Sequence, residues 1–185
     1  MELADHGWVS NLAREVYQRS GENVYLCFQC QKCSAGCPVN FAMDYTPAQL
    51  LEAVRLDQES LVLASKTAWL CASCETCTTR CPQEVDLAKI MDTIKMISLE
   101  KGTSALPKVS SFYHSFLLDL KFFGRIYELG LMMWLKLQTR EFTKDLELGM
   151  EMMRRRNLKI IPHFVRHREV QKIFNKVQEL ERSAR

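Results

Sequence analysis

Eight cysteines, gathered in two short runs, are the most reactive feature of this 185-residue sequence. The runs are CFQCQKCSAGCP, with Cys27, Cys30, Cys33 and Cys37, and CASCETCTTRCP, with Cys71, Cys74, Cys77 and Cys81. Both read C-x2-C-x2-C-x3-C-P. The N-terminus lacks the basic-then-apolar order of a secretory signal, so we expect a cytoplasmic protein whose thiols stay reduced. Thiolates at this spacing bind metal, and we expect metal chemistry rather than disulfides.

The pattern is the ligand run that holds two [4Fe-4S] clusters in bacterial-type ferredoxins. Three cysteines two residues apart wrap around one cube. The fourth is expected to begin a helix that points away, so it must bind the other cube. Crossing the two motifs predicts the ligands of cluster 1 as Cys27, Cys30, Cys33 and Cys81, and those of cluster 2 as Cys71, Cys74, Cys77 and Cys37. These eight are the predicted cofactor-binding and metal-binding residues, and no residue is predicted to be catalytic.

A zinc-stabilised adaptor is the alternative from another functional class, because structural zinc sites also use C-x2-C pairs. A zinc site needs only two such pairs. A zinc-binding function would therefore leave unexplained the third cysteine at the same interval and the Cys-Pro sequence at the end of both motifs. The cysteines therefore favour iron–sulfur clusters.

Charge is distributed unevenly along the chain. Residues 1–107 contain 9 Lys and Arg against 13 Asp and Glu, whereas residues 108–185 contain 16 against 9. The basic half lacks interleaved surface aromatics and a recognised DNA-binding motif, so a cluster-based sensor of nucleic acid is the least favoured alternative and we expect no nucleic-acid partner. Charged residues interrupt the most apolar stretch, 112–137, so no membrane span is expected.

Helix-forming residues dominate outside the motifs, and the sequence contains only 7 Gly and 5 Pro, which together predict an all-α fold. Caps and periodicity place the elements. We expect a helix over 10–19, an extended stretch over 23–26, a helix opened by Thr46 and Pro47, another over 59–70, and one from Asp86 to Gly102. Beyond a linker at 103–107, helices are expected around 111–139, around 143–155 and from 163 to the end.

The 33 residues from Pro38 to Leu70 that separate the motifs read as helix rather than as the short connection of a small ferredoxin. This arrangement resembles the α-helical ferredoxin domain of the iron–sulfur subunits of succinate dehydrogenase and fumarate reductase. We therefore expect an N-terminal helix at 1–19, an α-helical ferredoxin domain at 20–106 and a helical, partner-binding extension at 107–185. With all eight cysteines present, both sites should hold complete cubes.

Length, both motifs and the helical tail together resemble the C-subunit family of the heterodisulfide reductases of methanogenic archaea. The resemblance implies a hetero-oligomer in which this chain relays single electrons. The donor would be a flavin- and iron–sulfur-containing A subunit, and the acceptor a CCG-containing B subunit that reduces the CoM-S-S-CoB heterodisulfide in methanogenesis. The sequence itself has no CCG element and no G-x-G-x-x-G, so it should be non-catalytic alone. A relay subunit of another quinone- or thiol-linked oxidoreductase remains an alternative.

Two further expectations concern the tail and the charges. The tail holds more large apolar side chains than one helical layer can bury, which favours a partner surface: Met132, Met133, Met150, Met152, Met153, Phe116, Phe122, Phe123 and Trp134. Lys32 and Arg80 adjoin predicted ligands of cluster 1, whereas Glu75 adjoins ligands of cluster 2. Because positive charge favours the reduced cube, cluster 1 is expected to have the higher potential.

Overall fold

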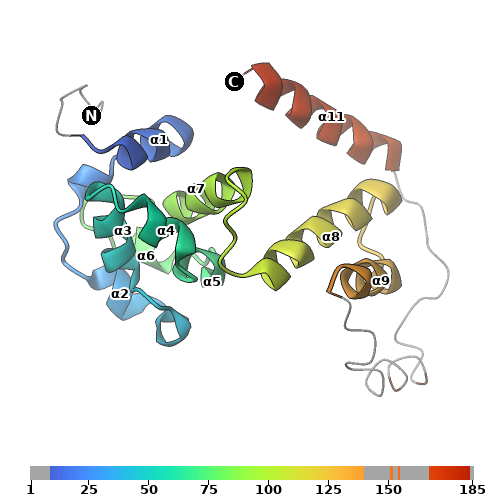
Figure 1. The fold of residues 1–185 in the computed structure, drawn as a ribbon, viewed down its shortest axis with the longest axis horizontal. Coiled ribbons are helices and arrows are strands. Elements are labelled where there is room, and N and C mark those ends of the chain that lie inside the picture. The colour runs from blue at the N-terminus through green and yellow to red at the C-terminus, as the bar shows by residue number, and fades with distance from the viewer. Residues whose placement is uncertain (1–8, 140–150, 152–153, 155–166, 184–185) are drawn as a thin grey trace. The chain divides into compact units, whose positions relative to one another are not determined.

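A computed structural model describes residues 9–139, 151, 154 and 167–183. These residues form helices and no strands, so the predicted all-α class is confirmed (Figure 1). Contacts divide the chain into two compact units, Met1–Leu106 and Pro107–Arg185. The functional boundaries expected near residues 19 and 106 stay predictions.

The first unit alternates short and longer helices around the two cysteine motifs. Its elements are α1 (Asn11–Ser20), η1 (Val24–Leu26), α2 (Lys32–Gly36), η2 (Asn40–Ala42), α3 (Pro47–Arg55), α4 (Glu59–Ala64), α5 (Thr67–Leu70), α6 (Thr76–Thr79) and α7 (Leu87–Glu100). Each motif contributes one short helix, α2 or α6, and a longer helix, α3 or α7, follows it. The stretch predicted as extended at 23–26 is instead a single 3-10 turn, because the Asn23 side chain accepts a hydrogen bond from the Tyr25 N–H at 2.9 Å.

The longer helices begin where their caps predict. The Thr46 side chain accepts from the Gln49 N–H while the Gln49 side chain accepts from the Thr46 N–H, and Pro47 occupies the first helical position of α3. At the start of α7, the Asp86 side chain accepts from the Lys89 N–H. These caps fix the first turns of α3 and α7.

A single apolar core holds the first unit together. Its largest fully buried side chains come from α1, α3, α4 and α7 and from the loops beside them: Leu12, Val16, Val24, Leu50, Leu51, Val54, Val62, Val85, Leu87, Ile90, Ile94 and Ile97. Burying one such side chain contributes about 1.5–3 kcal/mol before the entropy cost of folding. Since α1 packs against both α7 and α3, the N-terminal helix shares this core with the cysteine region.

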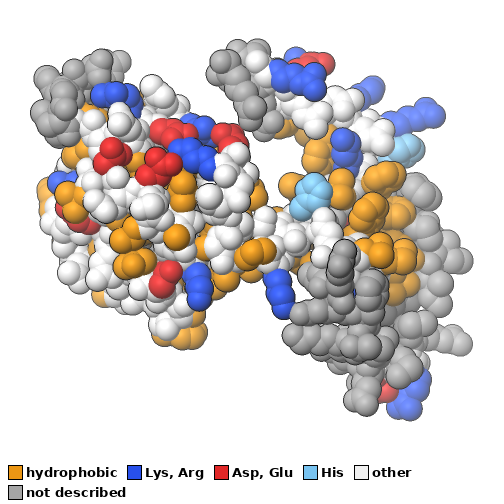
Figure 2. Space-filling view, viewed as in Figure 1, with side chains coloured by type: hydrophobic (Ala, Val, Ile, Leu, Met, Phe, Trp, Pro, Cys, Tyr) orange, Lys and Arg blue, Asp and Glu red, His pale blue; other side chains and the backbone are white. Residues whose placement is uncertain are grey.

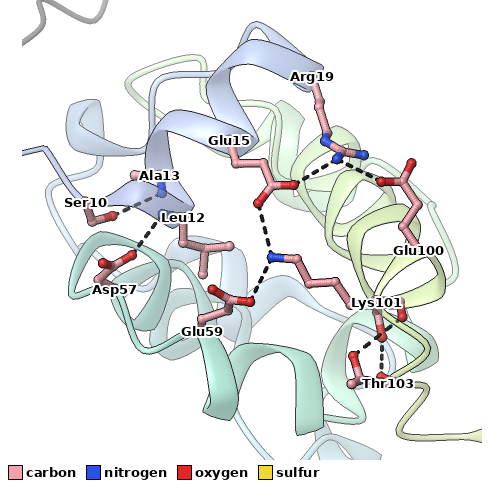
Figure 3. A network of polar contacts seen from close by, with 11 residues as sticks. Ser10, Leu12, Ala13, Glu15, Arg19, Asp57, Glu59, Glu100, Lys101 and Thr103 are labelled. Carbon is pink, nitrogen blue, oxygen red and sulfur yellow. Dashed lines mark hydrogen bonds and ion pairs between the residues drawn. The ribbon is translucent and has the colours of Figure 1, made fainter. Parts of the chain in front are cut away.

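A network of ion pairs, in which acidic and basic side chains alternate, links α1 to α4 and to the end of α7 (Figure 3). Arg19 bridges Glu15 at 2.8 Å and Glu100 at 2.9 Å. Lys101 bridges Glu15 at 3.3 Å and Glu59 at 2.8 Å. Single pairs at the surface contribute little, but here each central residue serves two partners, so the ordering cost is shared. The hydrogen bond from Arg19 to Glu100 and the one from Lys101 to Glu59 raise the pKa values of both cations.

The helix predicted over 59–70 is broken in the structure at Ser65 and Lys66. The break has a specific cause, the Asp44 carboxylate from the loop after the first motif. Asp44 Oδ1 accepts from Ser65 Oγ at 2.8 Å and from Thr67 Oγ1 at 2.7 Å, and Oδ2 accepts from the Lys66 N–H at 2.8 Å. Burial raises the pKa of Asp44, but these hydrogen bonds outweigh it and lower the pKa to about 2. The ionised carboxylate therefore ties the exit of motif one to the entry of motif two.

The second unit contains α8 (Pro107–Phe123), α9 (Glu128–Thr139) and α11 (His167–Ser183), with α8 packed against both other helices. The single helix predicted over 111–139 is wrong, because the chain turns at Gly124 with φ of +72°, a conformation that favours glycine. The helix predicted around 143–155 lies outside the described residues except at Glu151 and Arg154. In the described part of the chain, no helix combines the length and apolar composition that crossing a bilayer requires.

We predict that Asp44→Asn destabilises the first unit more than Asp57→Asn does. Asparagine turns one carboxylate oxygen into a donor that faces a backbone N–H, that of Lys66 in one orientation and that of Thr67 in the other. Asp57 accepts one hydrogen bond, from the Leu12 N–H at 2.9 Å. The expected cost at Asp44 is about 1–2 kcal/mol, or a lowering of Tm by at least about 4 °C. Anaerobic thermal unfolding followed by circular dichroism measures both. Equal melting temperatures for the two variants would contradict the role of Asp44.

Candidate metal centre

The structure gathers the eight cysteines around two cavities. The first is lined by Cys27, Cys30, Cys33 and Cys81. The second is lined by Cys37, Cys71, Cys74 and Cys77. Each set takes three cysteines from one motif and one from the other, as the crossed assignment expects. Ligation by each sulfur stays a prediction.

Two short helices produce this crossing. Cys33 lies in α2 at the first cavity, and Cys37, directly after this helix, lies at the second. Cys77 lies in α6 at the second cavity, and Cys81, just after that helix, lies at the first. Four residues of helix advance the chain by roughly 6 Å. Since α2 packs against α6, the pair separates the two cavities and contributes sulfurs to both.

The expectation that the fourth cysteine begins a helix is wrong. Cys37 caps the C-terminus of α2, with φ of −75° and ψ of 120°, and Cys81 follows the end of α6. The cause is the proline after each, Pro38 or Pro82, which disfavours helical geometry in the preceding residue. The Cys-Pro pair is therefore a helix stop that leaves the last sulfur beyond the helix.

Left-handed backbone conformations flank the second cysteine of both motifs. Gln29 and Gln31 have φ of 58° and 61°, and their counterparts Ser73 and Glu75 have φ of 49° and 58°. None is glycine, so each costs of order 1 kcal/mol. Such turns direct successive N–H groups inward and form nests that favour anions, including iron–sulfur clusters. In the first motif the Gln29 N–H donates to Cys27 Sγ at 3.3 Å.

Other donors reach the sulfurs. The Val85 N–H donates to Cys81 Sγ at 3.4 Å, and Thr76 Oγ1 lies 3.4 Å from Cys74 Sγ. The hydrogen bond with the Thr76 side chain lowers the pKa of the exposed Cys74 thiol. Burial instead raises the pKa values of the thiols of Cys27, Cys33 and Cys77. A metal must displace the protons of these buried and partly buried thiols, so metal binding and folding are coupled.

The first turns of α3 and α7 complete the walls. Pro47 lines the second cavity and Ala48 the first, while Leu87 lines the first and Ala88 the second. The positive ends of both helix dipoles thus lie beside sites that would hold negatively charged groups. Each start is also tied to a cysteine helix: the Ala48 N–H donates to Ser34 Oγ of α2 at 3.1 Å. Thr78 Oγ1 of α6 donates to Asp86 Oδ1 at 2.9 Å.

Two basic side chains that the sequence analysis missed approach the motifs from these helices. Arg55 Nη1 donates to the Cys27 carbonyl oxygen and Lys95 Nζ donates to the Cys71 carbonyl oxygen, both at 3.4 Å. Among the described residues Arg55 Nε is buried and has no hydrogen-bond partner. A spacing signal was available, because Arg55 and Lys95 are each preceded by an acid three residues earlier and are separated by 95 − 55 = 40 positions.

These features fit a [4Fe-4S] cluster in each cavity. Zinc is held by four sulfurs at about 2.3 Å, which needs them to converge on one point. Here no group of three or more His, Cys, Asp or Glu side chains in the described residues is close enough for a single metal ion. The sulfurs instead line two separate cavities, which also have N–H donors and helix N-termini suited to an anionic group.

Residues 13–85 match the family model of a 4Fe-4S dicluster domain. The matched stretch, 85 − 13 + 1 = 73 of the 185 residues, contains all eight cysteines. No curated protein sequence matches the chain significantly. The match confirms the predicted cofactors, two [4Fe-4S] clusters.

We predict that Cys37→Ser damages the cluster that Cys71, Cys74 and Cys77 bind and leaves the other cluster in place, because Cys37 lies at the second cavity. Cys81→Ser, its counterpart, should have the opposite selectivity. EPR and Mössbauer spectra of the two reduced variants, with iron and sulfide content, distinguish the clusters. If Cys37→Ser perturbs the cluster bound by Cys27, Cys30 and Cys33, the crossed assignment is wrong.

Proposed function

We propose that this ferredoxin-type iron–sulfur protein, which carries two [4Fe-4S] clusters and serves in electron transfer, is the relay subunit of an oxidoreductase complex. The observation that carries the proposal is the α2 and α6 pair. Each helix places one cysteine at each cavity, so one pair of packed helices would hold both cofactors. When bound, the clusters supply one-electron chemistry.

The chain's own residues position and shield these cofactors. Apolar side chains line the inner wall of each cavity: Ala48 and Leu87 in the first, and Val39, Met43, Ala88 and Met91 in the second. Phe28 also lines the first cavity, yet its side chain is largely exposed. The first site is therefore covered from inside by the core and bordered outside by an aromatic ring, as suits a cofactor that exchanges electrons with another protein.

We further propose that the complex is a cytoplasmic heterodisulfide reductase and that this chain fills its C-subunit role. The support is the resemblance in length, motifs and helical tail, together with the helical ferredoxin-type architecture. The partners would be an A subunit with flavin and iron–sulfur clusters and a CCG-containing B subunit that reduces CoM-S-S-CoB. A quinone- or thiol-linked oxidoreductase is the second candidate. Purification of the native complex and identification of its subunits separates the two, since only the first contains both partners.

The exposed apolar surface of α8 and α9 supports a partner-binding role for the second unit. The buried residues of α8 are the polar Ser115 and Asp119, whereas large apolar side chains remain exposed on α8 and α9. These are Phe112, Tyr113, Leu117, Phe122, Met133, Trp134 and Leu137. Figure 2 shows apolar side chains gathered on the surface of this unit. Burial in an interface would remove this apolar surface from water.

We predict that a chain shortened to end at Leu106 keeps both clusters but loses its partner subunits. All eight cysteines and the buried core lie before that residue, whereas the exposed apolar surface of α8 and α9 lies after it. Iron and sulfide analysis measures the clusters, and co-purification with affinity-tagged partners measures assembly. Assembly of the shortened chain at the level of the full chain would contradict the assignment of the tail.

The two exposed charges that the sequence analysis singled out do lie at different sites. Lys32 lines the first cavity and Glu75 the second. Arg80 lines neither cavity, and its side chain lies against Gly36 of α2. We predict that cluster 1 has the higher potential and that Lys32→Glu and Glu75→Lys shrink or reverse the difference by roughly 40 mV per unit charge. EPR-monitored redox titration at two salt concentrations measures this. Midpoints that neither swap moves would refute it.

A further inference from the structure

We propose that Arg55 and Lys95 are corresponding positioning residues, one for each cluster. Each fixes the first cysteine of its motif and raises the reduction potential of the cluster bound there. The inference rests on the two clusters and not on the identity of any partner. It can therefore fail while the proposed complex stands, and the reverse also holds.

The two residues occupy equivalent places in the repeated half. Their helices start from caps 40 positions apart, Thr46 and Asp86, and the basic residues are also 40 positions apart. Each donates at 3.4 Å to the carbonyl oxygen of the cysteine that opens its motif, Cys27 or Cys71. Two helices of different sequence and length thus present a cation to the same backbone atom of each motif.

Each cation also has the same internal partner, a carboxylate one helical turn earlier. Arg55 pairs with Glu52 at 2.8 Å, and Lys95 pairs with Asp92 at 3.0 Å. Glu52 and Asp92 are again 92 − 52 = 40 positions apart. The same nitrogen, Nη1 of Arg55 or Nζ of Lys95, donates both to this carboxylate and to the cysteine carbonyl, so the ion pair restrains the flexible cation beside the cysteine loop.

Both cations are shielded from water. The side chain of Arg55 is 26% exposed and that of Lys95 only 12% exposed. The guanidinium of Arg55 also lies over the Tyr25 ring at 5.6 Å, and its buried Nε has no partner among the described residues. A shielded charge is screened less by ions than the exposed Lys32 or Glu75, so its effect on a nearby anionic cofactor is less sensitive to salt.

The sign of the effect follows from charge. Reduction adds one electron and no bond or proton to a cluster, so the reduced form is more negative and a nearby cation favours it. Arg55 should therefore raise the potential of cluster 1 and Lys95 that of cluster 2. Because they occupy equivalent positions, their effects largely cancel in the difference between the clusters, which leaves that difference to residues such as Lys32 and Glu75.

The test is a redox titration of the intact complex or the full chain, with dithionite as reductant and EPR as readout. Arg55→Gln should lower the reduction equilibrium constant of cluster 1 by roughly fivefold, or about 40 mV, and leave cluster 2 in place. Lys95→Gln should do the same to cluster 2 alone. Each cluster is identified through the Cys37→Ser and Cys81→Ser variants.

Three controls separate charge from structure. Lys89→Gln removes a cation from the same helix as Lys95, but Lys89 pairs with Glu22 instead, so both potentials should stay unchanged. Arg55→Lys and Lys95→Arg retain the charge and should restore the potential if the glutamine variants bind clusters poorly. Glu52→Gln and Asp92→Asn remove the opposing carboxylate and should shift the same cluster upward, which a merely structural role would not produce.

The proposal is overturned if Arg55→Gln or Lys95→Gln leaves its own cluster unmoved, or if both clusters shift equally in either variant. It is also overturned if Lys89→Gln shifts a potential as much as Lys95→Gln does. Where a glutamine variant loses iron, the pair of charge-retaining and carboxylate variants decides the question: shifts of the expected sign support the proposal, and unchanged potentials refute it.

Discussion

Everything in the first unit depends on one requirement, that each cofactor cavity draws cysteines from both motifs. Neither motif can complete a cavity alone, so the 33 residues that connect the motifs must bring the second motif back beside the first. This connecting segment contains α3, α4 and α5, whose apolar faces pack with α1 and α7 into the core. The Asp44 carboxylate joins the segment after the first motif to the segment before the second through hydrogen bonds to Lys66 and Thr67. Core and cofactor sites are therefore one cooperative structure.

The two halves use the same devices with different residues. The cysteine loop turns twice through left-handed conformations in each motif, at Gln29 and Gln31 or at Ser73 and Glu75. A hydroxyl on the cysteine helix ties down the following helix, through Ser34 in one half and Thr78 in the other. The two halves thus share the same backbone turns and the same kind of hydrogen bond, although the residues that form them differ. This explains why the repeat is plain in the structure and barely visible outside the cysteines in the sequence.

What the sequence could predict was local. The capping chemistry of Thr46, Asp86 and Gly102 marked helix ends correctly, and the cysteine spacing predicted two clusters. What it could not predict came from contacts between distant residues. The break before α5 depends on Asp44, more than twenty positions away, and the approach of Arg55 and Lys95 to the motifs depends on how α3 and α7 pack. The turn at Gly124 is an exception, because it follows a local signal: glycine is the residue that its backbone conformation favours.

The contact between Gly36 and Arg80 couples the two cysteine motifs sterically. These are counterpart positions, each directly before the last cysteine of its motif, and a Cβ added at Gly36 would lie only 2.9 Å from Arg80 Cδ. Two glycines here would leave the space between α2 and α6 unfilled, and two arginines would compete for it. A larger residue at Gly36 would require the Arg80 side chain to move, so the residue tolerated before the last cysteine of one motif depends on the residue at the same place in the other. The two motifs therefore constrain one another sterically as well as through the cysteines that they contribute to each other's cavity.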